Sequence, residues 1–231
     1  MLSMAENSSN TTDRSFTVIG STKTSSVSES SATRLEIAVA AADLASVAGL
    51  EGLSLSRLAA ELGMSKSGLY AHFSSKEELQ LSAVAAAAAV FADQLEAAGA
   101  ATDAGYPRLS ALMDAWLDYL EGEPFSGGCF FAAVGAEFDD RPGTVRERLV
   151  ELTGSWREAI TDELTIAANA SELLPETDTE QLAFELLAFL HEANRVYQLH
   201  DSAGAFRSAR IAINATLSRA ATDLGRQRAT T

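Results

Sequence analysis

The sequence predicts an all-α protein with two parts. Proline is rare, with 4 residues in 231, and aromatic residues make up only 7% of the chain. Alanine, leucine and glutamate are abundant, and these residues favour helices. Apolar residues recur every three to four positions in successive segments, which is the period of an amphipathic helix. With 47% hydrophobic residues, the chain can bury one small and one larger core.

The first 32 residues differ from the rest in composition. They are rich in Ser and Thr, show almost no helical periodicity and contain too few apolar residues for a core. We therefore expect residues 1–32 to form a disordered tail. The segment also lacks the apolar run and the cleavage pattern of a secretory signal.

Two short helices are expected on either side of Gly63. The first begins after Ser54, whose hydroxyl can cap free backbone N–H groups, and its apolar residues follow helical spacing. Gly63 ends it in the left-handed conformation that glycine tolerates best. Ser65 can cap the second helix, in which Leu69 and Phe73 share the inward face. The segment therefore predicts a helix-turn-helix.

The second helix has a small outer face. Winding at about 100° per residue places Ser67 opposite the buried face, with Gly68 and Tyr70 at its sides. A glycine inside a helix costs about 1 kcal/mol relative to alanine, which is unfavourable unless another molecule approaches the backbone closely. A DNA groove is such a partner, because Lys66 can reach a guanine or a phosphate and Tyr70 and His72 can reach phosphates.

A long helix is expected to begin after Ser75 and to continue to about Ala98. Ser75 and Glu78 have the spacing of a capping box. Lys76 lies at the positive end of this helix, where a cation is unfavourable. A phosphate contact would explain Lys76, whereas a solvated surface lysine is the commoner alternative.

This segment resembles the DNA-binding domain of the TetR family, the tetracycline repressor-like regulators of bacterial transcription. The resemblance covers about residues 34–80, and these residues fall at the family's spacing: Gly63, Ser65, Lys66, Leu69, Tyr70, Phe73, Lys76 and Leu79. It implies a DNA-binding domain over residues 33–80. The DNA contacts that it implies are Ser54, Ser56, Lys66, Ser67, Gly68, Tyr70, His72 and Lys76. The pair Ser67-Gly68 departs from the Gly-Thr of many members.

The net charge of −15 is the main objection to DNA binding, because affinity for a polyanion depends on neutralised phosphates. Many of the acidic residues lie beyond residue 130, and the helix-turn-helix segment itself has a small positive balance. Family members often carry a basic N-terminal arm, to which only Arg14, Lys23 and Arg34 could contribute here. We expect weak nonspecific binding with a marked salt dependence.

Five further helical segments are expected after the long helix, at about 106–120, 129–138, 144–170, from Thr179 and from about Ala203. The resemblance implies that residues 81–231 form an effector-binding and dimerisation domain. In the family, the last two helices of each subunit pair across a two-fold axis as a four-helix bundle. This implies a homodimer on a palindromic operator.

The resemblance also implies a pocket for a small-molecule effector of unknown identity. Aromatic residues, and polar ones on apolar helices, are candidates for its lining: Trp116, Tyr119, Phe130, Phe131, Trp156, Phe189, His191 and Asn194. The alternative for each aromatic residue is that it is an ordinary core residue. For His191 the alternative is a core histidine whose hydrogen bonds are made within the protein. Cys129 is expected to be a buried, inert thiol.

An enzyme is the main rival class, and the sequence offers little for it. We find no phosphate-binding glycine loop, no nucleophile motif and no metal-ligand spacing, and therefore expect no catalytic residue, cofactor or metal. No apolar run approaches the ~18–20 residues of a membrane span, and a single cysteine suits a reducing cytoplasm. We expect a repressor that its effector releases from the operator. The alternative is an all-α interaction protein on the same scaffold without operator binding.

Overall fold

The computed structural model describes residues 29–229, and every regular element in this range is a helix. This confirms the all-α prediction. Near the C-terminal end, one isolated antiparallel bridge also joins Leu173 to Ala221. The helices are α1 (Glu29–Ala48), α2 (Leu55–Glu61), α3 (Lys66–Tyr70), α4 (Lys76–Ala100), α5 (Tyr106–Glu121), α6 (Phe130–Glu137), α7 (Thr144–Asn169), α8 (Thr179–His200), α9 (Gly204–Ala220) and α10 (Asp223–Arg228).

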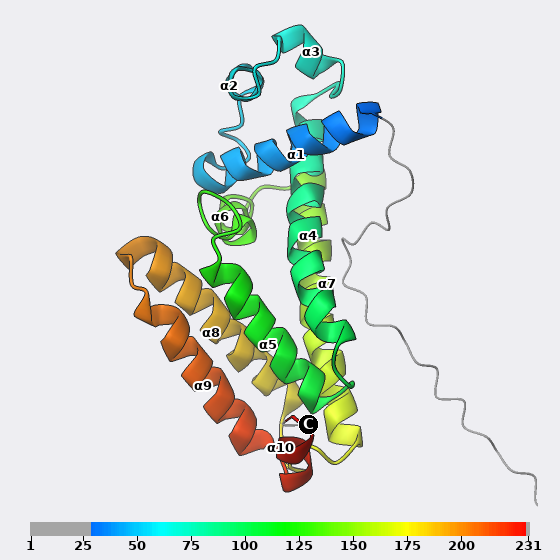
Figure 1. Cartoon of the computed structure of the whole chain (residues 1–231), viewed down its shortest axis with the longest axis vertical. Helices are drawn as coiled ribbons and strands as arrows, with labels where there is room; N and C mark the ends of the chain where they lie inside the picture. The colour runs from blue at the N-terminus through cyan, green and yellow to red at the C-terminus, as the bar shows by residue number, and fades with distance from the viewer. Residues whose placement is uncertain (1–28, 230–231) are drawn as a thin grey trace, which may run out of the picture.

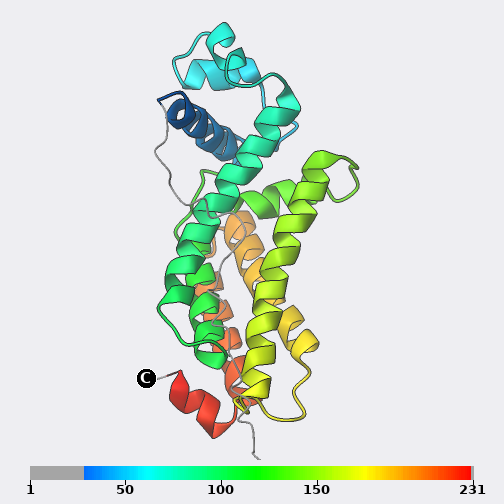
Figure 2. The same ribbon diagram turned by 90° about the vertical axis from the view of Figure 1, so that its right-hand side faces the viewer.

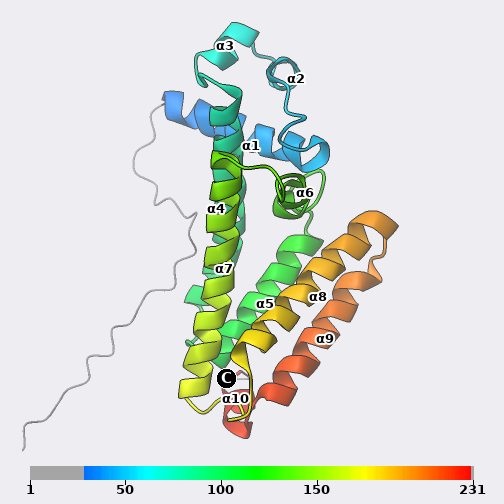
Figure 3. The same ribbon diagram turned by 180° about the vertical axis from the view of Figure 1, so that it is seen from behind.

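The helices form a small head and a longer body that share α4. Figure 1 shows α1, α2 and α3 around the first turns of α4, at the opposite end of the molecule from α10. The rest of α4 packs against α5 and α7 in the body, and α8 pairs with α9 along one side. The view from behind shows the same order, with α6 lying between α1 and the upper end of α5 (Figure 3).

Three serines cap the head helices as the sequence predicts. Gly63 also has the predicted left-handed conformation, with φ of +63°. Each capping hydroxyl accepts a hydrogen bond from the backbone N–H three residues later. The pairs are Ser54 with Arg57 at 3.4 Å, Ser65 with Gly68 at 3.0 Å, and Ser75 with Glu78 at 3.0 Å.

α4 is the core helix of both parts. By length and composition alone α4 could also cross a membrane. Its longest apolar run is Ala83–Ala92, which is shorter than the ~18–20 residues of a membrane span, as expected from the sequence. Three of its alanines, Ala83, Ala87 and Ala88, are fully buried, and α1, α5 and α7 pack on this helix. Small side chains allow this close approach. One continuous hydrophobic cluster results, and it runs from the head into the body.

Two features differ from the sequence expectations. Residues 29–32, assigned to the tail, form the first turn of α1 instead. α10 was not expected, although Thr222 caps it in the usual way by accepting a hydrogen bond from Gly225 N. The remaining tail, with Arg14 and Lys23 as arm residues, lies outside the described residues.

Two buried carboxylates hold the end of the body farthest from the head. Glu163 accepts a hydrogen bond from Gly105 N at 2.7 Å, and Glu172 accepts one from Tyr106 N at 2.8 Å. Glu172 also forms an ion pair with Arg228 of α10. Carboxylates at the positive N-terminal end of α5 are stabilised by its free N–H groups. These contacts tie together α5, α7 and α10, whose ends lie near one another at the bottom of Figure 2.

Gly105→Ala is expected to destabilise the chain by about 2 kcal/mol. Gly105 has φ of +98°, and an added Cβ would lie 2.5 Å from the Glu172 Oε2. The measurement is urea unfolding followed by circular dichroism. Gly154→Ala in α7 is the matched control: its Cβ meets nothing within 4 Å, so the change should stabilise by up to about 1 kcal/mol. Equal effects of the two variants would contradict this prediction.

Candidate DNA-binding and effector sites

All eight candidate DNA-contacting residues lie in the head, on or beside α2, α3 and the start of α4 (Figure 1). Beneath them, Leu69 and Phe73 are 0% and 1% exposed, as the predicted inward face requires. Tyr70 is 46% exposed. The exposed candidates are Ser54, Ser56, Lys66, Ser67 and Tyr70, whereas Gly68, His72 and Lys76 are half-buried.

Gly68 lies at the cap of α3. A Cβ at this position would lie 3.1 Å from the Oγ of Ser65, which also lies 3.1 Å from the Ser67 hydroxyl. The equivalent cap positions of α2 and α4 carry Arg57 and Glu78, so such a cap does not by itself require glycine.

Lys76 is engaged by the turn between α1 and α2. Its Nζ donates to the Glu51 carbonyl at 2.6 Å and pairs with the Glu51 carboxylate at 3.3 Å. Gln80 of α4 donates to the same carboxylate at 3.3 Å. The hydrogen bonds from Gln80 and then Lys76 lower the pKa of Glu51. A DNA phosphate at Lys76 would thus compete with Glu51, a residue that sequence spacing did not connect with it.

Arg34 is part of the head's own packing. Its guanidinium lies 4.3 Å from the Phe73 ring centroid, pairs with Glu78 at 2.7 Å and donates to the His72 carbonyl. Hydrogen bonds from Ser74, and then from Arg34, lower the pKa of Glu78 to about 2. Arg34, which could also contribute to a basic arm, thus stabilises the junction of α1, α3 and α4.

Polar contacts join the body to the head, and we call them the head–body clamp. Glu137, at the end of α6, accepts hydrogen bonds from Leu50 N at 2.7 Å and Glu51 N at 2.9 Å. Ser126, before α6, donates to the Asp43 carboxylate of α1 through its N–H at 2.7 Å and its hydroxyl at 2.9 Å. Glu51 thus meets a body residue with its backbone and Lys76 with its side chain.

Five of the effector-pocket candidates lie together in the body, around Phe91 of α4. We call this set the aromatic cluster: Phe91, Trp116, Tyr119, Phe130, Phe131 and Trp156. Phe91 lies 4.9 Å from Trp116 and 4.3 Å from Trp156, centroid to centroid. Phe131 lies 4.5 Å from Trp156 and 5.1 Å from Phe130. Every member is buried, so these residues build the core of the body.

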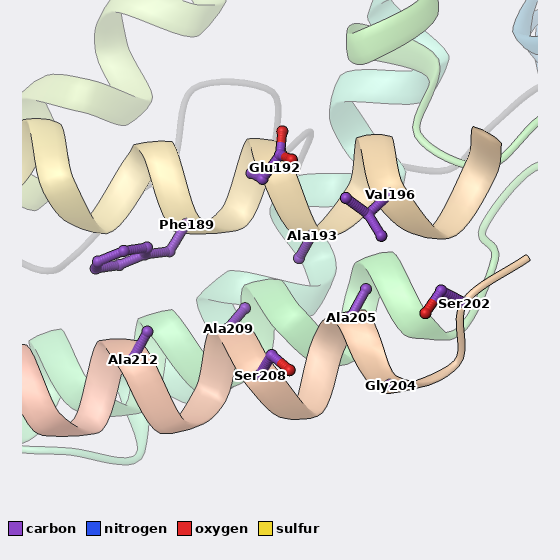
Figure 4. A pocket seen from close by; sticks show the side chains of 10 residues that line it. All are labelled: Phe189, Glu192, Ala193, Val196, Ser202, Gly204, Ala205, Ser208, Ala209 and Ala212. Atoms are coloured by element: carbon purple, nitrogen blue, oxygen red, sulfur yellow. The ribbon is translucent and has the colours of Figure 1, made fainter. Parts of the chain in front are cut away.

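The other three effector-pocket candidates, all on α8, differ in their exposure and in the face of the helix on which they lie. Asn194 is buried on the face that packs inward. His191 is exposed, and Phe189 is half-buried and lines a groove between α8 and α9. Figure 4 shows Phe189 and Ala193 of α8 pointing toward Ala212 and Ala209 of α9 across this groove of about 450 Å³. Phe189 and His191 thus stand apart from the aromatic cluster.

Cys129 immediately precedes α6, beside the aromatic cluster, and its surroundings do not activate its thiol. Its thiol is near enough to Tyr119 to raise that residue's pKa slightly, beyond the larger effect of burial. Burial raises the pKa of Cys129 as well. Both groups are therefore protonated at neutral pH, as expected of an inert thiol.

Two family models match this chain. Residues 37–84 match the model described as "Bacterial regulatory proteins, tetR family", and residues 105–213 match "Tetracyclin repressor-like, C-terminal domain". Together they take in most of the head with the start of α4, and the body from α5 into α9; residues 85–104 lie between the two matches. No curated protein matches significantly.

Solved structures share the whole architecture. A TetR transcriptional regulator from Chloroflexus aurantiacus J-10-FL is 27% identical, with a TM-score of 0.78 over 84% of this chain and 98% of that one. One from Cytophaga hutchinsonii is 23% identical, with a TM-score of 0.74 over 86% and 100%. AibR, solved with isovaleryl coenzyme A and operator DNA, is 20% identical, with a TM-score of 0.64 over 79% and 97%. The last two likenesses concern the fold alone.

Glu78→Gln is expected to lower the melting temperature at pH 7 and to have a shrinking effect as the pH falls. Because the pKa of Glu78 is lowered from 4.5 to about 2, its carboxylate stabilises the fold above pH 4.5. This stability is lost as the pH falls toward 2, where the wild type is protonated too. Thermal melts of both chains between pH 7 and pH 3 measure the difference. Glu36→Gln, an exposed change on α1, should leave the pH 7 melting temperature unchanged.

Glu137→Ala is expected to speed hydrogen exchange at the Leu50 and Glu51 amides by about tenfold, because both lose their acceptor. Exchange measured by mass spectrometry on peptides that span residues 49–53 reports this. Asp140→Ala, an exposed acid three residues later, is the control and should leave that peptide unchanged. Equal exchange in the two variants would show that the clamp does not hold the head.

Proposed function

The chain belongs to the TetR family of bacterial transcriptional regulators, and we propose that it is a repressor that binds a palindromic operator as a homodimer and leaves it when an effector binds. The observation that carries the proposal is the exposed α3, capped by Ser65 and seated on Leu69 and Phe73, within the segment that matches the family's DNA-binding model. The fold is that of regulators, which are not enzymes. We place the protein in the cytoplasm, where operators lie.

Operator contacts come from α3 and its surroundings. Lys66 and Tyr70 are exposed at its two ends, where they can meet base edges or phosphates in the major groove. Ser54 and Ser56 lie at the start of α2, a position suited to the DNA backbone. Lys76 adds a phosphate contact when the phosphate displaces the Glu51 carboxylate. In a chain with a net charge of −15, two correctly spaced heads are needed for affinity.

The dimer forms through α8 and α9. Several apolar residues of these helices, such as Leu186, Leu190 and Ile213, are buried within the subunit. The outer faces carry Phe184, Leu199 and Ile211, which are 58%, 66% and 64% exposed. The small residues that line the groove between the two helices leave room for a partner's side chains (Figure 4). These faces support a four-helix bundle across a two-fold axis.

Release from the operator follows from a population shift. An effector in the body favours an arrangement of α4 and α6 in which the two heads no longer match successive major grooves. α4 runs through both parts, and the head–body clamp links the end of α6 to the turn that engages Lys76. AibR, a neighbour with the same fold, was solved in complex with isovaleryl coenzyme A and operator DNA, which supports a site for each kind of ligand.

Lys66→Ala is expected to weaken operator binding about tenfold and to reduce the salt dependence of log affinity by about one per subunit. Fluorescence anisotropy with the intergenic DNA beside the protein's own gene, at several salt concentrations, measures both. Arg157→Ala, which removes an exposed charge midway along α7 in the body, should leave both unchanged. If the wild type fails to bind the operator at low salt, the result favours the alternative, an all-α interaction protein without operator binding.

Ala212→Arg is expected to convert the homodimer to a monomer, because a long charged side chain then fills the groove between α8 and α9. Size-exclusion chromatography with light scattering gives the mass directly. Val150→Arg on α7 adds the same charge at an exposed apolar residue elsewhere and should leave the dimer intact. A dimeric Ala212→Arg variant would place the interface on another face.

A further inference from the structure

Three buried polar atoms in the body have no hydrogen-bond partner among residues 29–229: the Tyr119 hydroxyl, the Trp156 indole N–H and the Asn194 amide oxygen. Their residues are 5%, 5% and 6% exposed. Buried polar groups nearly always have partners, because an unsatisfied one has lost its hydrogen bonds to water and gained none. The buried carboxylates Glu163 and Glu172 of the same body are satisfied. Three unsatisfied atoms in one core indicate a partner that binds there.

Two of the three atoms belong to Tyr119 and Trp156, whose rings both pack on the ring of Phe91. Phe91 of α4 lies 5.0 Å from the Tyr119 ring and 4.3 Å from the Trp156 ring. Tyr119 comes from α5 and Trp156 from α7. Asn194 lies on the buried face of α8, and α8 packs against both α5 and α7. The unsatisfied atoms therefore come from three helices that pack on one another, and two of them belong to rings that pack on Phe91.

The chemistry of these atoms defines what can satisfy them. The Trp156 N–H can only donate a hydrogen bond, and the Asn194 amide oxygen can only accept one. Burial raises the pKa of Tyr119, so its hydroxyl stays protonated and can donate. A complementary molecule carries an acceptor oxygen for the two donors and an N–H or O–H group for Asn194.

The buried charged residues of the core limit the charge that a ligand can carry. Within the described chain, Glu163 and Glu172 are the only buried charged residues, and both are engaged at the N-terminal end of α5. No buried Lys or Arg is available for an anion, and no free buried carboxylate for a cation. Burying an unpaired charge is strongly unfavourable, so the part of the ligand that enters this core is neutral.

We infer that the effector is an uncharged ring compound whose carbonyl-type oxygen accepts hydrogen bonds from Tyr119 and Trp156 and whose hydroxyl or N–H group donates to Asn194. This rests on the proposed function, because it takes the body to be the effector-binding part. The cluster's rings meet mostly edge to face, as at Phe91 with Tyr119 and at Phe131 with Trp156. A flat ring can join such an arrangement with favourable contacts of the same kind.

The first test needs no ligand. Tyr119→Phe removes only the unsatisfied hydroxyl, so it should raise the melting temperature of the free protein by roughly 2 °C. Tyr106→Phe is the matched control, because Tyr106 is equally buried at 5% but its hydroxyl bonds to Ser218. That variant should melt at a lower temperature than the wild type. If Tyr119→Phe lowers the melting temperature as well, its hydroxyl is a structural group and the inference is overturned.

The second test uses three compounds of similar shape: methyl 4-hydroxybenzoate, the 4-hydroxybenzoate anion and 4-ethyltoluene. The neutral ester supplies both an acceptor and a donor, and should raise the wild-type melting temperature more than the anion or the hydrocarbon does. In Tyr119→Phe this rise should fall by at least about half. No rise with the ester, an equal rise with either other compound, or a full rise in Tyr119→Phe overturns the assigned class.

Operator binding by the same preparations separates this inference from the proposed function. If wild type and Tyr119→Phe bind the operator equally but the ester stabilises neither, the effector class fails and the regulator stands. If the ester stabilises the wild type selectively and neither chain binds operator, the ligand site stands and the regulator fails.

Discussion

The packing of other helices on α4 is the constraint on which the rest of the structure depends. Its first half carries Leu79 and Ala83 into the head, and Phe91 and Leu95 farther along belong to the body. Both parts therefore share one hydrophobic cluster, and neither can reorient without disturbing the other's core. A rigid element common to two sites is the kind of structure through which binding at one site can bias the other.

Hydrogen bonds between the body and the head supplement this shared apolar packing. The carboxylate of Glu137 replaces water for two backbone N–H groups of the turn after α1, and the Ser46 hydroxyl accepts a hydrogen bond from Gly127 N at 2.9 Å. Hydrogen bonds are sensitive to small displacements in a way that apolar packing is not. α6 thus contributes Phe130 and Phe131 to the aromatic cluster near its start and holds the head through Glu137 at its end.

The local features of the candidate DNA-binding site were predictable, whereas its electrostatic partners were not. Caps at Ser54, Ser65 and Ser75 depend on neighbours three residues away, so spacing along the chain reveals them. The contacts of Lys76 with Glu51 and of Arg34 with Glu78 join residues 25 and 44 positions apart. The helical periodicity of the sequence does not reveal ion pairs between residues so far apart. Likewise, the aromatic cluster could be proposed residue by residue, but helix packing alone separates its members from Phe189 and His191.

Most of the helices, the head caps and the family could be read from the sequence alone, because each depends on short-range spacing and residue type, whereas α10 could not. Tertiary structure decided which charges are neutralised, which apolar faces of α8 and α9 remain open, and which polar atoms are buried without partners. Tyr106 and Tyr119 make the difference plain. Both are aromatic residues on α5 with the same exposure, yet only Tyr106 meets a hydroxyl partner. That outcome depends on which helix packs opposite each one, and helix packing is settled only when the whole core assembles.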